Sequence, residues 1–283
     1  MAAINIKNMK KYFYFCLIPF GFVLACSSRA IEADTIDPNI IILKDSNFEK
    51  ELIAQKLDTD GIVNGKMTRQ DAEDIKVLSV PNLQIKSLAG IEAFKNLSYL
   101  DCSLNQITDI DVSQNSFLES FDCSSNLLTK IDLTKNLNLS ALNCVNNQLQ
   151  DLNIKSTLLY ALNASDNLLA SISVEASSRL TTLTISNNQL TTLNLSNNII
   201  LSELRCNSNK LAMINLSKNI KLRYLDVSKN ALTALELCKN IEILKLICSS
   251  NNISKITISN KIQTLFTEKS ALIDSDTTYM VCD

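Results

Sequence analysis

Hydrophobic residues recur along most of the chain at an interval that neither a lone helix nor a lone strand explains. From residue 97 onward the phrase LxxLxCxxN is followed by a second apolar stretch, and the next copy begins 21 residues later. The first residues of the successive copies are Leu97, Leu118, Leu139, Leu159, Leu180, Leu201, Leu222 and Ile243. Only the interval from Leu139 to Leu159 is shorter, by one residue. Such a period is typical of a solenoid, in which each repeat forms one coil and buries its apolar side chains against its neighbours.

The polar positions of the repeat are as regular as the apolar ones. Every copy carries one asparagine at the end of its first half, namely Asn105, Asn126, Asn147, Asn167, Asn188, Asn209, Asn230 and Asn251. A buried turn must satisfy its backbone groups, and an amide side chain both donates and accepts hydrogen bonds. We therefore expect these asparagines to hold the turns. The second half of the repeat has a looser series: Asn115, Asn136, Asn198, Asn219 and Asn240.

The apolar pattern extends beyond these eight copies. Residues 75–91 form an earlier coil that ends on a Leu-x-Gly-Ile sequence, and residues 262–272 form a degenerate last coil. With about ten coils at about 4.8 Å per strand, the sheet would be roughly 43 Å long.

The cysteine-containing repeat of 21 residues resembles that of leucine-rich repeat proteins, and among them the internalin-like bacterial surface proteins. The resemblance covers roughly residues 40–272. It implies a leucine-rich repeat solenoid of the α/β type, in which short parallel strands stack in one curved sheet. It also implies a small helical EF-hand-like N-terminal cap. We assign residues 37–74 to the cap, residues 75–272 to the repeats and residues 273–283 to a C-terminal tail.

Two short helices are expected in the cap. Asp45 or Ser46 would begin the first helix, over residues 47–57, and the second would start near Thr68 and include Ala72. The open edge strand of a sheet invites aggregation, so shielding that edge is a sufficient role for the cap.

The loop between these helices partly matches an EF-hand calcium loop. Its side chains at positions 1, 5, 7 and 12 are those of Asp60, Asn64, Lys66 and Asp71, with glycine at position 6. Position 3 is Ile62, which offers no side-chain oxygen, and position 12 is aspartate where a bidentate glutamate is usual. Two interpretations stay open: a relic loop without metal, or a weak calcium site, which would be the chain's only cofactor site.

The first 25 residues have the order of a secretory signal peptide. Lys7, Lys10 and Lys11 precede an apolar run from Tyr12 to Leu24. This run is shorter than the ~20 residues that span a bilayer as a helix, which favours a cleaved signal over a membrane anchor. Translation could begin at Met1 or at Met9, and the sequence does not decide between them.

The signal ends in Val-Leu-Ala-Cys, which resembles a bacterial lipobox. We expect Cys26 to receive a diacylglycerol group and to become the first residue of the mature chain, with residues 26–36 as a tether. Each buried methylene of the acyl chains would add about 0.8 kcal/mol of membrane affinity. An ordinary signal peptide that happens to contain a cysteine is the alternative.

Apart from Cys16 within the signal peptide, the other cysteines divide into two groups. Five occupy the same inward position of the repeat, where other coils have alanine, isoleucine or valine: Cys102, Cys123, Cys144, Cys206 and Cys248. Strands about 4.8 Å apart hold parallel side chains too far apart for disulfides, so we expect a ladder of buried thiols. A zinc site is disfavoured because the chain has no histidine and no CxxC pair. Cys238 and Cys282 lie outside the ladder and are candidates for a disulfide.

Composition argues against catalysis and against nucleic-acid binding. The 283 residues include no histidine, so neither a Ser-His-Asp nor a Cys-His arrangement is available. The net charge is only -2, and there is no basic tract. We therefore predict a protein that is not an enzyme and does not bind nucleic acid.

Specificity should then lie on the outward face of the sheet. Side chains alternate along a strand, so we expect the residues on either side of each buried leucine to point outward, together with the third residue after it, such as Ser103 or Ser124. The middle of this face is small and neutral, whereas its ends carry the aromatic and charged residues typical of binding hot spots. The predicted contact residues are Tyr99, Asp101, Asp122, Glu203, Arg205, Tyr224 and Asp226.

Two classes of function follow for this chain. The first is a monomeric, exported lipoprotein of the bacterial cell envelope, anchored to a membrane through Cys26, whose sheet face binds a protein on another cell or a host. The internalin resemblance implies this adhesion role. The second is an envelope component that binds polysaccharide or scaffolds its neighbours. No LPxTG-like wall-sorting sequence occurs in the chain, so the lipid would provide the attachment.

Overall fold

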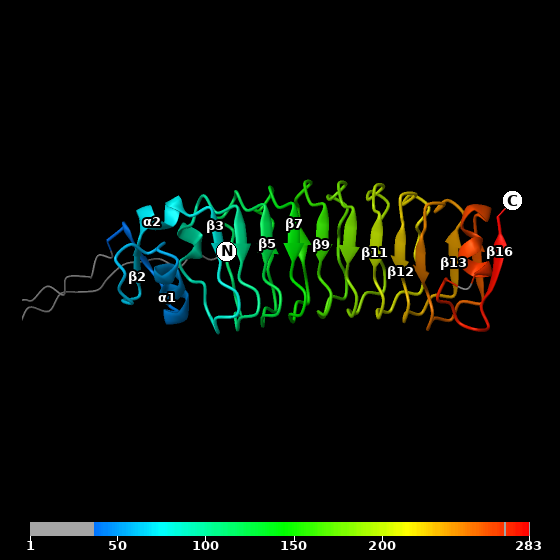
Figure 1. Cartoon of the computed structure of the whole chain (residues 1–283), viewed down its shortest axis with the longest axis horizontal. Helices are drawn as coiled ribbons and strands as arrows, with labels where there is room; N and C mark the ends of the chain where they lie inside the picture. The colour runs from blue at the N-terminus through cyan, green and yellow to red at the C-terminus, as the bar shows by residue number, and fades with distance from the viewer. Residues whose placement is uncertain (1–36, 269, 283) are drawn as a thin grey trace, which may run out of the picture. The chain divides into compact units, whose positions relative to one another are not determined.

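The repeats build a stack of coils, each of which adds one short strand to a parallel sheet (Figure 1). The computed structural model describes residues 37–268 and 270–282. The predicted signal peptide, the lipidation site Cys26 and the tether, which together make up residues 1–36, lie outside the described residues. Among the described residues, no helix combines the length and the apolarity needed to cross a bilayer.

The main sheet has nine strands in the order in which the coils follow one another. Each strand pairs with the next in parallel, and equivalent repeat positions face each other, as Leu183 does Leu204. The strands are β3 (Val77–Ser79), β4 (Tyr99–Asp101), β5 (Ser120–Asp122), β7 (Ala141–Asn143), β9 (Ala161–Asn163), β10 (Thr182–Thr184), β11 (Glu203–Arg205), β12 (Tyr224–Asp226) and β14 (Lys245–Ile247). A bridge from Ile247 to Leu272 extends the stack by one coil.

The return half of each coil is mostly turns, with short strands in some coils. β6 (Asp132–Leu133) pairs with β8 (Asn153–Ile154) in parallel. Near the C-terminal end, β13 (Ala234–Leu237), β15 (Lys255–Ile258) and β16 (Thr278–Val281) form a three-stranded sheet. Helical turns in the coils are η1 (Ile91–Ala93), η2 (Asn260–Ile262) and α3 (Thr264–Thr267).

The asparagine of each first half-repeat forms the hydrogen bonds that the sequence predicts. Asn105 donates from Nδ2 to the carbonyls of Val80, Cys102 and Ser103, and its Oδ1 accepts from the backbone N–H groups of Leu83 and Ile85. The amide therefore joins its own turn to the preceding coil. Equivalent bonds recur through the stack, for example at Asn126 and at Asn188.

These amides support a turn that uses left-handed backbone without glycine. The residue before each asparagine has a φ between 52° and 60°, in the series Leu104, Ser125, Asn146, Asp166, Asn187, Ser208, Lys229 and Ser250. Residues other than glycine pay roughly 1 kcal/mol or more for this conformation. The repeated side-chain hydrogen bonds offset that cost, which explains how a solenoid of this length manages with four glycines.

The five ladder thiols are buried, as the sequence predicts, and carry no disulfide. Burial raises the pKa of every one of them, to about 12 for Cys144 and for Cys248. The thiols therefore act as small apolar side chains. Cys238 and Cys282 do form a disulfide, with their Cα atoms 6.0 Å apart, and it attaches the end of β16 to the coil of β13.

The last coil differs in detail from the repeat pattern. Leu272, the last apolar residue of the predicted final coil, pairs with Ile247 at an outward position of the sheet and is 53% exposed, whereas Ala271 before it is buried. Residues 278–281 of the predicted tail form β16 and pair with β15.

The cap contains both predicted helices, as α1 (Ser46–Ala54) and α2 (Arg69–Asp74), with an antiparallel pair of β1 (Ile40–Ile42) and β2 (Lys66–Thr68). Asp45 begins α1, because its Oδ1 accepts from the N–H groups of Asn47 and Phe48. Its Oδ2 accepts from the N–H groups of Lys86 and Ser87 in the first coil, at 2.7 and 3.3 Å. One carboxylate thus caps the helix and fastens the cap to the repeats.

Candidate binding face

The outward side chains of the nine-stranded sheet, here called the sheet face, include all seven predicted contact residues. In each strand the middle residue is buried, as Leu204 is, and the residues on either side of it are at least partly exposed. Tyr99, Asp101 and Asp122 lie near the cap, on β4 and β5, whereas the other four lie on β11 and β12. Six strand steps separate β4 from β12, which corresponds to about 29 Å.

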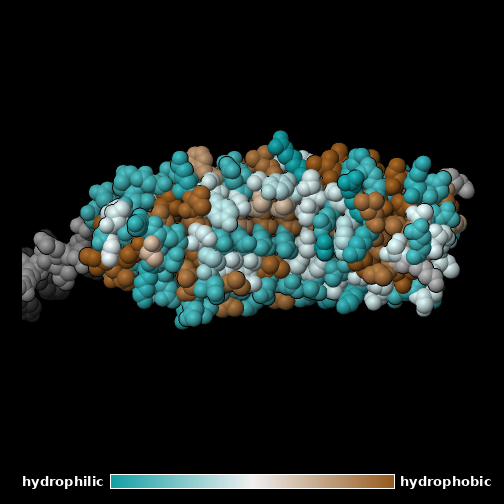
Figure 2. Space-filling view, viewed as in Figure 1, coloured by the Kyte–Doolittle hydropathy of each residue, from teal (hydrophilic) through white to brown (hydrophobic). Residues whose placement is uncertain are grey.

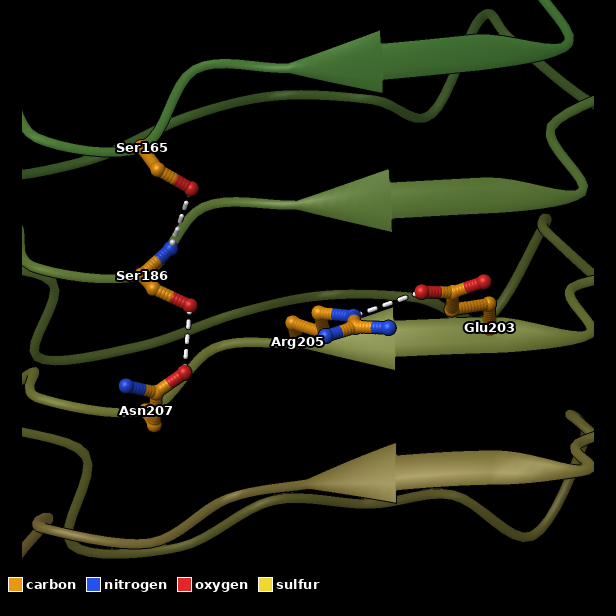
Figure 3. Close-up of polar contacts among 5 residues, drawn as sticks. All are labelled: Ser165, Ser186, Glu203, Arg205 and Asn207. Atoms are coloured by element: carbon orange, nitrogen blue, oxygen red, sulfur yellow. Dashed lines mark hydrogen bonds and ion pairs between the residues drawn. The ribbon is translucent and has the colours of Figure 1, made fainter. Parts of the chain in front are cut away.

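The end of the sheet face away from the cap carries an ordered group of charged and aromatic side chains. The Cζ atom of Arg205 lies 4.2 Å from the ring centroid of Tyr224, and Nζ of Lys245 lies 5.2 Å from the same centroid. Arg205 also donates from Nε to Oε1 of Glu203 at 2.6 Å (Figure 3), and this bond raises the pKa of the guanidinium. We call Glu203, Arg205, Tyr224 and Lys245 the Tyr224 cluster. Its side chains hold one another in place before any partner arrives.

The end near the cap is acidic. Oδ1 of Asp122 accepts from N and Oγ of Ser124, at 2.9 and 2.6 Å, and Asp101 makes the same pair of bonds with Ser103. Desolvation, followed by the charges of Asp101 and Asp122, raises the pKa of Tyr99. Asp226 bonds Ser228 in the same manner, so each of the three aspartates also stabilises the turn that follows its strand.

One row of the sheet face differs from the sequence expectation. The third residue after the buried middle residue of each strand was expected to point outward. In four coils this residue is a buried serine: Ser124, Ser165, Ser186 and Ser228. The chain already turns at this position, and the hydroxyls bond within or between coils. Ser165 Oγ accepts from the N–H of Ser186, and Ser186 Oγ donates to Oδ1 of Asn207 (Figure 3). This row is therefore part of the scaffold.

The middle of the sheet face is hollowed, which the sequence did not indicate. A trough of about 260 Å³ lies where β7 and β9 carry alanines between larger neighbours, and its outward lining residues are Ser120, Ala141, Asn143, Ala161, Asn163, Thr182 and Thr184. Edges of Phe121, Leu142 and Leu162 complete its floor. In Figure 2 an apolar strip lies at the middle of this face, with hydrophilic side chains on both sides. The one sequence signal of this hollow is the pair of small residues, Ala141 and Ala161, at the same position of neighbouring coils.

Of the four predicted calcium-loop residues, Asp60 and Asn64 lie in the loop, whereas Lys66 begins β2 and Asp71 lies in α2. Much of the hydrogen bonding of these side chains is internal to the cap. Oδ1 and Oδ2 of Asp60 accept from the N–H of Ile62 and from Nδ2 of Asn64, at 2.7 and 2.8 Å. Oδ2 of Asp71 accepts from Thr59 Oγ1 at 3.1 Å. Within the part of the chain that the structure describes, no group of three or more histidine, cysteine or acidic side chains is placed to hold a metal ion.

The centre of that loop holds a carboxylate. Oε1 of the buried Glu49, from α1, accepts from the N–H groups of Asn64, Gly65 and Lys66 at 2.8, 2.7 and 3.2 Å. The loop amides therefore surround an anion that belongs to the cap itself. This bonding ties the loop to α1 and supports a structural role for the cap.

A second acidic group of the cap is buried without a hydrogen bond. Asp58 is 3% exposed, and neither of its carboxylate oxygens has a partner among the described residues. Desolvation, followed by the charge of Asp60, raises the pKa of the Asp58 carboxyl to about 6. The cap therefore contains a group that titrates between acidic and neutral pH.

Comparison with solved structures supports the fold assignment. The functional domain of InlJ from Listeria monocytogenes, which includes a cysteine ladder, is 25% identical with a TM-score of 0.63, over 86% of this chain and 61% of that one. The Leptospira interrogans leucine-rich repeat protein LIC12759 is 21% identical with a TM-score of 0.52, over 72% of this chain and 67% of that one. The PEPR1–AtPEP1 structure is 21% identical with a TM-score of 0.61, over 75% of this chain and 32% of that one.

No protein-family model matches the chain, and neither does any curated protein. The chain spans about three fifths of the InlJ domain, 61% of its length. The stacked parallel strands, the asparagine turns and the ladder of buried thiols define a leucine-rich repeat solenoid. InlJ and other leucine-rich repeat proteins share this fold, so the fold is of the internalin-like type.

Proposed function

We propose that this chain is a binding protein of the bacterial cell envelope that recognises a protein partner through its sheet face and catalyses no reaction. The observation that carries the proposal is the Tyr224 cluster. Tyrosine and arginine dominate binding hot spots, and here Arg205 and Lys245 both lie against the Tyr224 ring. A side chain that is already ordered loses less conformational entropy when a partner covers it.

Export and anchoring complete the proposal. The signal-like residues 1–25 and the lipobox ending at Cys26 would deliver the chain across the membrane and attach it through acyl chains. The mass of the mature chain in the membrane fraction tests this part. A diacylglycerol on Cys26 supports it, and a chain that begins at or before Ser27 without added lipid mass contradicts it.

Polysaccharide binding or scaffolding is the alternative role for the same surface. The two tyrosines of the sheet face are separated by about 29 Å, so they do not form one continuous aromatic platform for a sugar chain. The sheet face also differs strongly between its ends in charge and size, a variation that suits the uneven surface of a folded protein.

Capture experiments with matched variants test the role of the Tyr224 cluster. The immobilised full chain is exposed to surface-protein extracts of the producing bacterium and of cells that it contacts, and to a glycan array in parallel. If these residues are hot spots, Arg205→Ala with Tyr224→Ala should weaken the binding of a captured protein by about 2 kcal/mol or more, which raises its Kd about thirtyfold. The control is Tyr160→Ala with Arg179→Ala, which removes two exposed residues of the same types outside the sheet face.

The two roles give different results in this experiment. A protein retained by the wild-type chain and by the control, but not by the Arg205 and Tyr224 variant, supports the proposal. Equal capture by all three chains contradicts the assignment to this surface. Glycan binding without selective protein capture favours the polysaccharide role instead.

A further inference from the structure

The trough at the middle of the sheet face has the properties of a specific subsite. Its floor consists of the methyl groups of Ala141 and Ala161 and the edges of the buried residues beneath them. Its volume of about 260 Å³ is below the range of roughly 300–1,000 Å³ that encloses a drug-sized molecule. The trough therefore fits a single side chain of a larger partner.

The chemistry of the floor favours an apolar side chain. A sugar or a charged group placed against alanine methyls would lose water without gaining hydrogen bonds, which costs free energy. An aromatic or branched aliphatic side chain gives up only unfavourable contact with water, and its burial is favourable by about 25 cal/mol for each Å² of apolar surface that is covered. The hydroxyls of Thr182 and Thr184 lie at one edge, where they can bond the partner's backbone.

The charges around the trough are unequal on its two sides. Asp122 lies on β5 opposite Asn143 of β7, two residues along the strand from the Ser120–Ala141 pair, and Asp101 lies one strand further toward the cap. Within residues 37–268 and 270–282, neither carboxylate forms an ion pair with a cationic side chain. On the other side, the first cation is Arg205, and Glu203 already pairs with it.

The two carboxylates are also held in position. Asp122 accepts from Asn143 Nδ2 at 2.8 Å through Oδ2, in addition to the two bonds from Ser124. Asn143 itself lines the trough, so the trough and the carboxylate form one bonded unit. A fixed carboxylate binds a guanidinium or an ammonium group with less loss of entropy than a mobile one does.

Building on the proposed function, we propose that the trough receives an aromatic or large aliphatic side chain of the protein partner while Asp122 and Asp101 bind a basic side chain beside it. One and two strand spacings separate β5 and β4 from β7, so these carboxylates lie on strands about 5 to 10 Å from the strand of Ala141, on the side toward the cap. The partner segment therefore has a defined direction along the stack, with its basic residue closer to the cap.

Small peptides with matched sequences test this subsite on the full chain. The probe is acetyl-arginyl-phenylalanine amide, compared with the glutamyl-phenylalanine and arginyl-alanine analogues, and the readout is the NMR shift of the ¹³C-labelled methyl groups of Ala141 and Ala161. We expect saturable shifts with the first probe and roughly tenfold weaker binding of both analogues, because each lacks one of the two contacts.

Two variants separate the charge effect from structural damage. Asp101→Asn with Asp122→Asn should weaken the arginyl-phenylalanine probe roughly threefold to tenfold, since the loss is that of a partly exposed ion pair. Asp111→Asn with Asp132→Asn is the control, because each of these carboxylates also accepts from the backbone N–H two residues on, but in the return half of its coil. Ala161→Trp should fill the trough and remove the response of Ala141.

The outcomes distinguish this inference from the proposed function. Equal binding of the glutamyl and arginyl probes, equal binding of the alanine analogue, or no methyl response at millimolar probe overturns the inference. If protein capture still depends on Arg205 and Tyr224 in that case, the proposed function stands alone. If only glycans bind, both fail.

Discussion

The asparagine at the end of each strand is the residue on which the coil depends most, and Asn126 offers a clean test. Its side chain is 6% exposed. Oδ1 accepts from the N–H of Ile107 at 3.0 Å, and Nδ2 donates to the carbonyls of Cys102 and Cys123 at 3.0 and 3.1 Å. Asn126→Ala therefore removes hydrogen bonds that connect two coils and deprives buried backbone groups of this partner.

The expected loss of stability follows from those backbone groups. The N–H of Ile107 loses the one partner it has, which costs about 1 to 3 kcal/mol for a buried donor. The carbonyls of Cys102 and Cys123 keep the amides of Asn105 and Asn147, so each loses one of two hydrogen bonds, at about 0.5 to 1.5 kcal/mol. We therefore expect Asn126→Ala to lower the free energy of unfolding by about 2 to 5 kcal/mol. Domains have a total stability of only about 5 to 15 kcal/mol, so this loss would be plain in a urea titration followed by circular dichroism.

A second asparagine provides the control. Asn138 is exposed and makes one bond, from Nδ2 to the carbonyl of Ser116 at 3.0 Å. Asn138→Ala should cost less than about 1 kcal/mol, because water can replace that bond. If the two substitutions cost the same, or if Asn126→Ala costs under about 1 kcal/mol, the asparagine series does not hold the coils together.

Four further predictions concern the cysteines and the cap. Cys238→Ser opens the disulfide across 44 residues, so the C-terminal coils should lose about 2 to 4 kcal/mol of local stability, measured by hydrogen exchange. The five ladder thiols should stay unreactive toward a thiol reagent in the native chain and react after denaturation, because burial raises their pKa. Between pH 3.8 and about 6 the folded chain holds more protons at Asp58 than the unfolded chain does, so the free energy of unfolding should fall as pH rises through this window. Asp58→Asn should remove this pH dependence and stabilise the cap at neutral pH by about 1 to 3 kcal/mol. Calcium at millimolar concentration should release no heat in calorimetry, because the loop amides already surround Glu49.

Each of these predictions has an outcome that contradicts it. Unchanged exchange rates near β16 would show that the disulfide is not needed to hold the end of the chain. A native ladder thiol that reacts would show that its coil opens readily. A flat pH profile in the wild-type chain would mean that Asp58 is solvated, and a saturable calcium isotherm that is lost in Asp60→Asn would restore the metal site.

The scaffold could be predicted because its physical demands repeat in every coil. The asparagine, the small inward thiol and the leading leucine each recur at the same position, so their roles are visible in the sequence. The left-handed turn was hidden, because the residue that adopts it varies from Leu104 to Lys229 and is never glycine. What fixes that turn is the neighbouring asparagine.

The binding surface was harder to predict because it depends on depth and on where the chain leaves the strand. Ala141 and Ala161 look unimportant in the sequence, yet two small residues on adjacent strands create the trough. The buried serines were misplaced because strict alternation was extended two residues beyond the strand, to positions such as Ser124. In the cap, the distant Glu49 bonds the loop amides, and no pattern within the loop itself indicates this partner.

Photo-cross-linking tests most directly whether the sheet face binds a protein. A benzophenone amino acid replaces Tyr224 on β12 in one chain, and in a second chain it replaces Met213, which is 75% exposed and lies in the return half of its coil. Both chains are irradiated with the same surface-protein extracts. We predict a discrete cross-linked protein from position 224 and none from position 213. Equal products from both positions, or a product from position 213 alone, would contradict the assignment of binding to the sheet face.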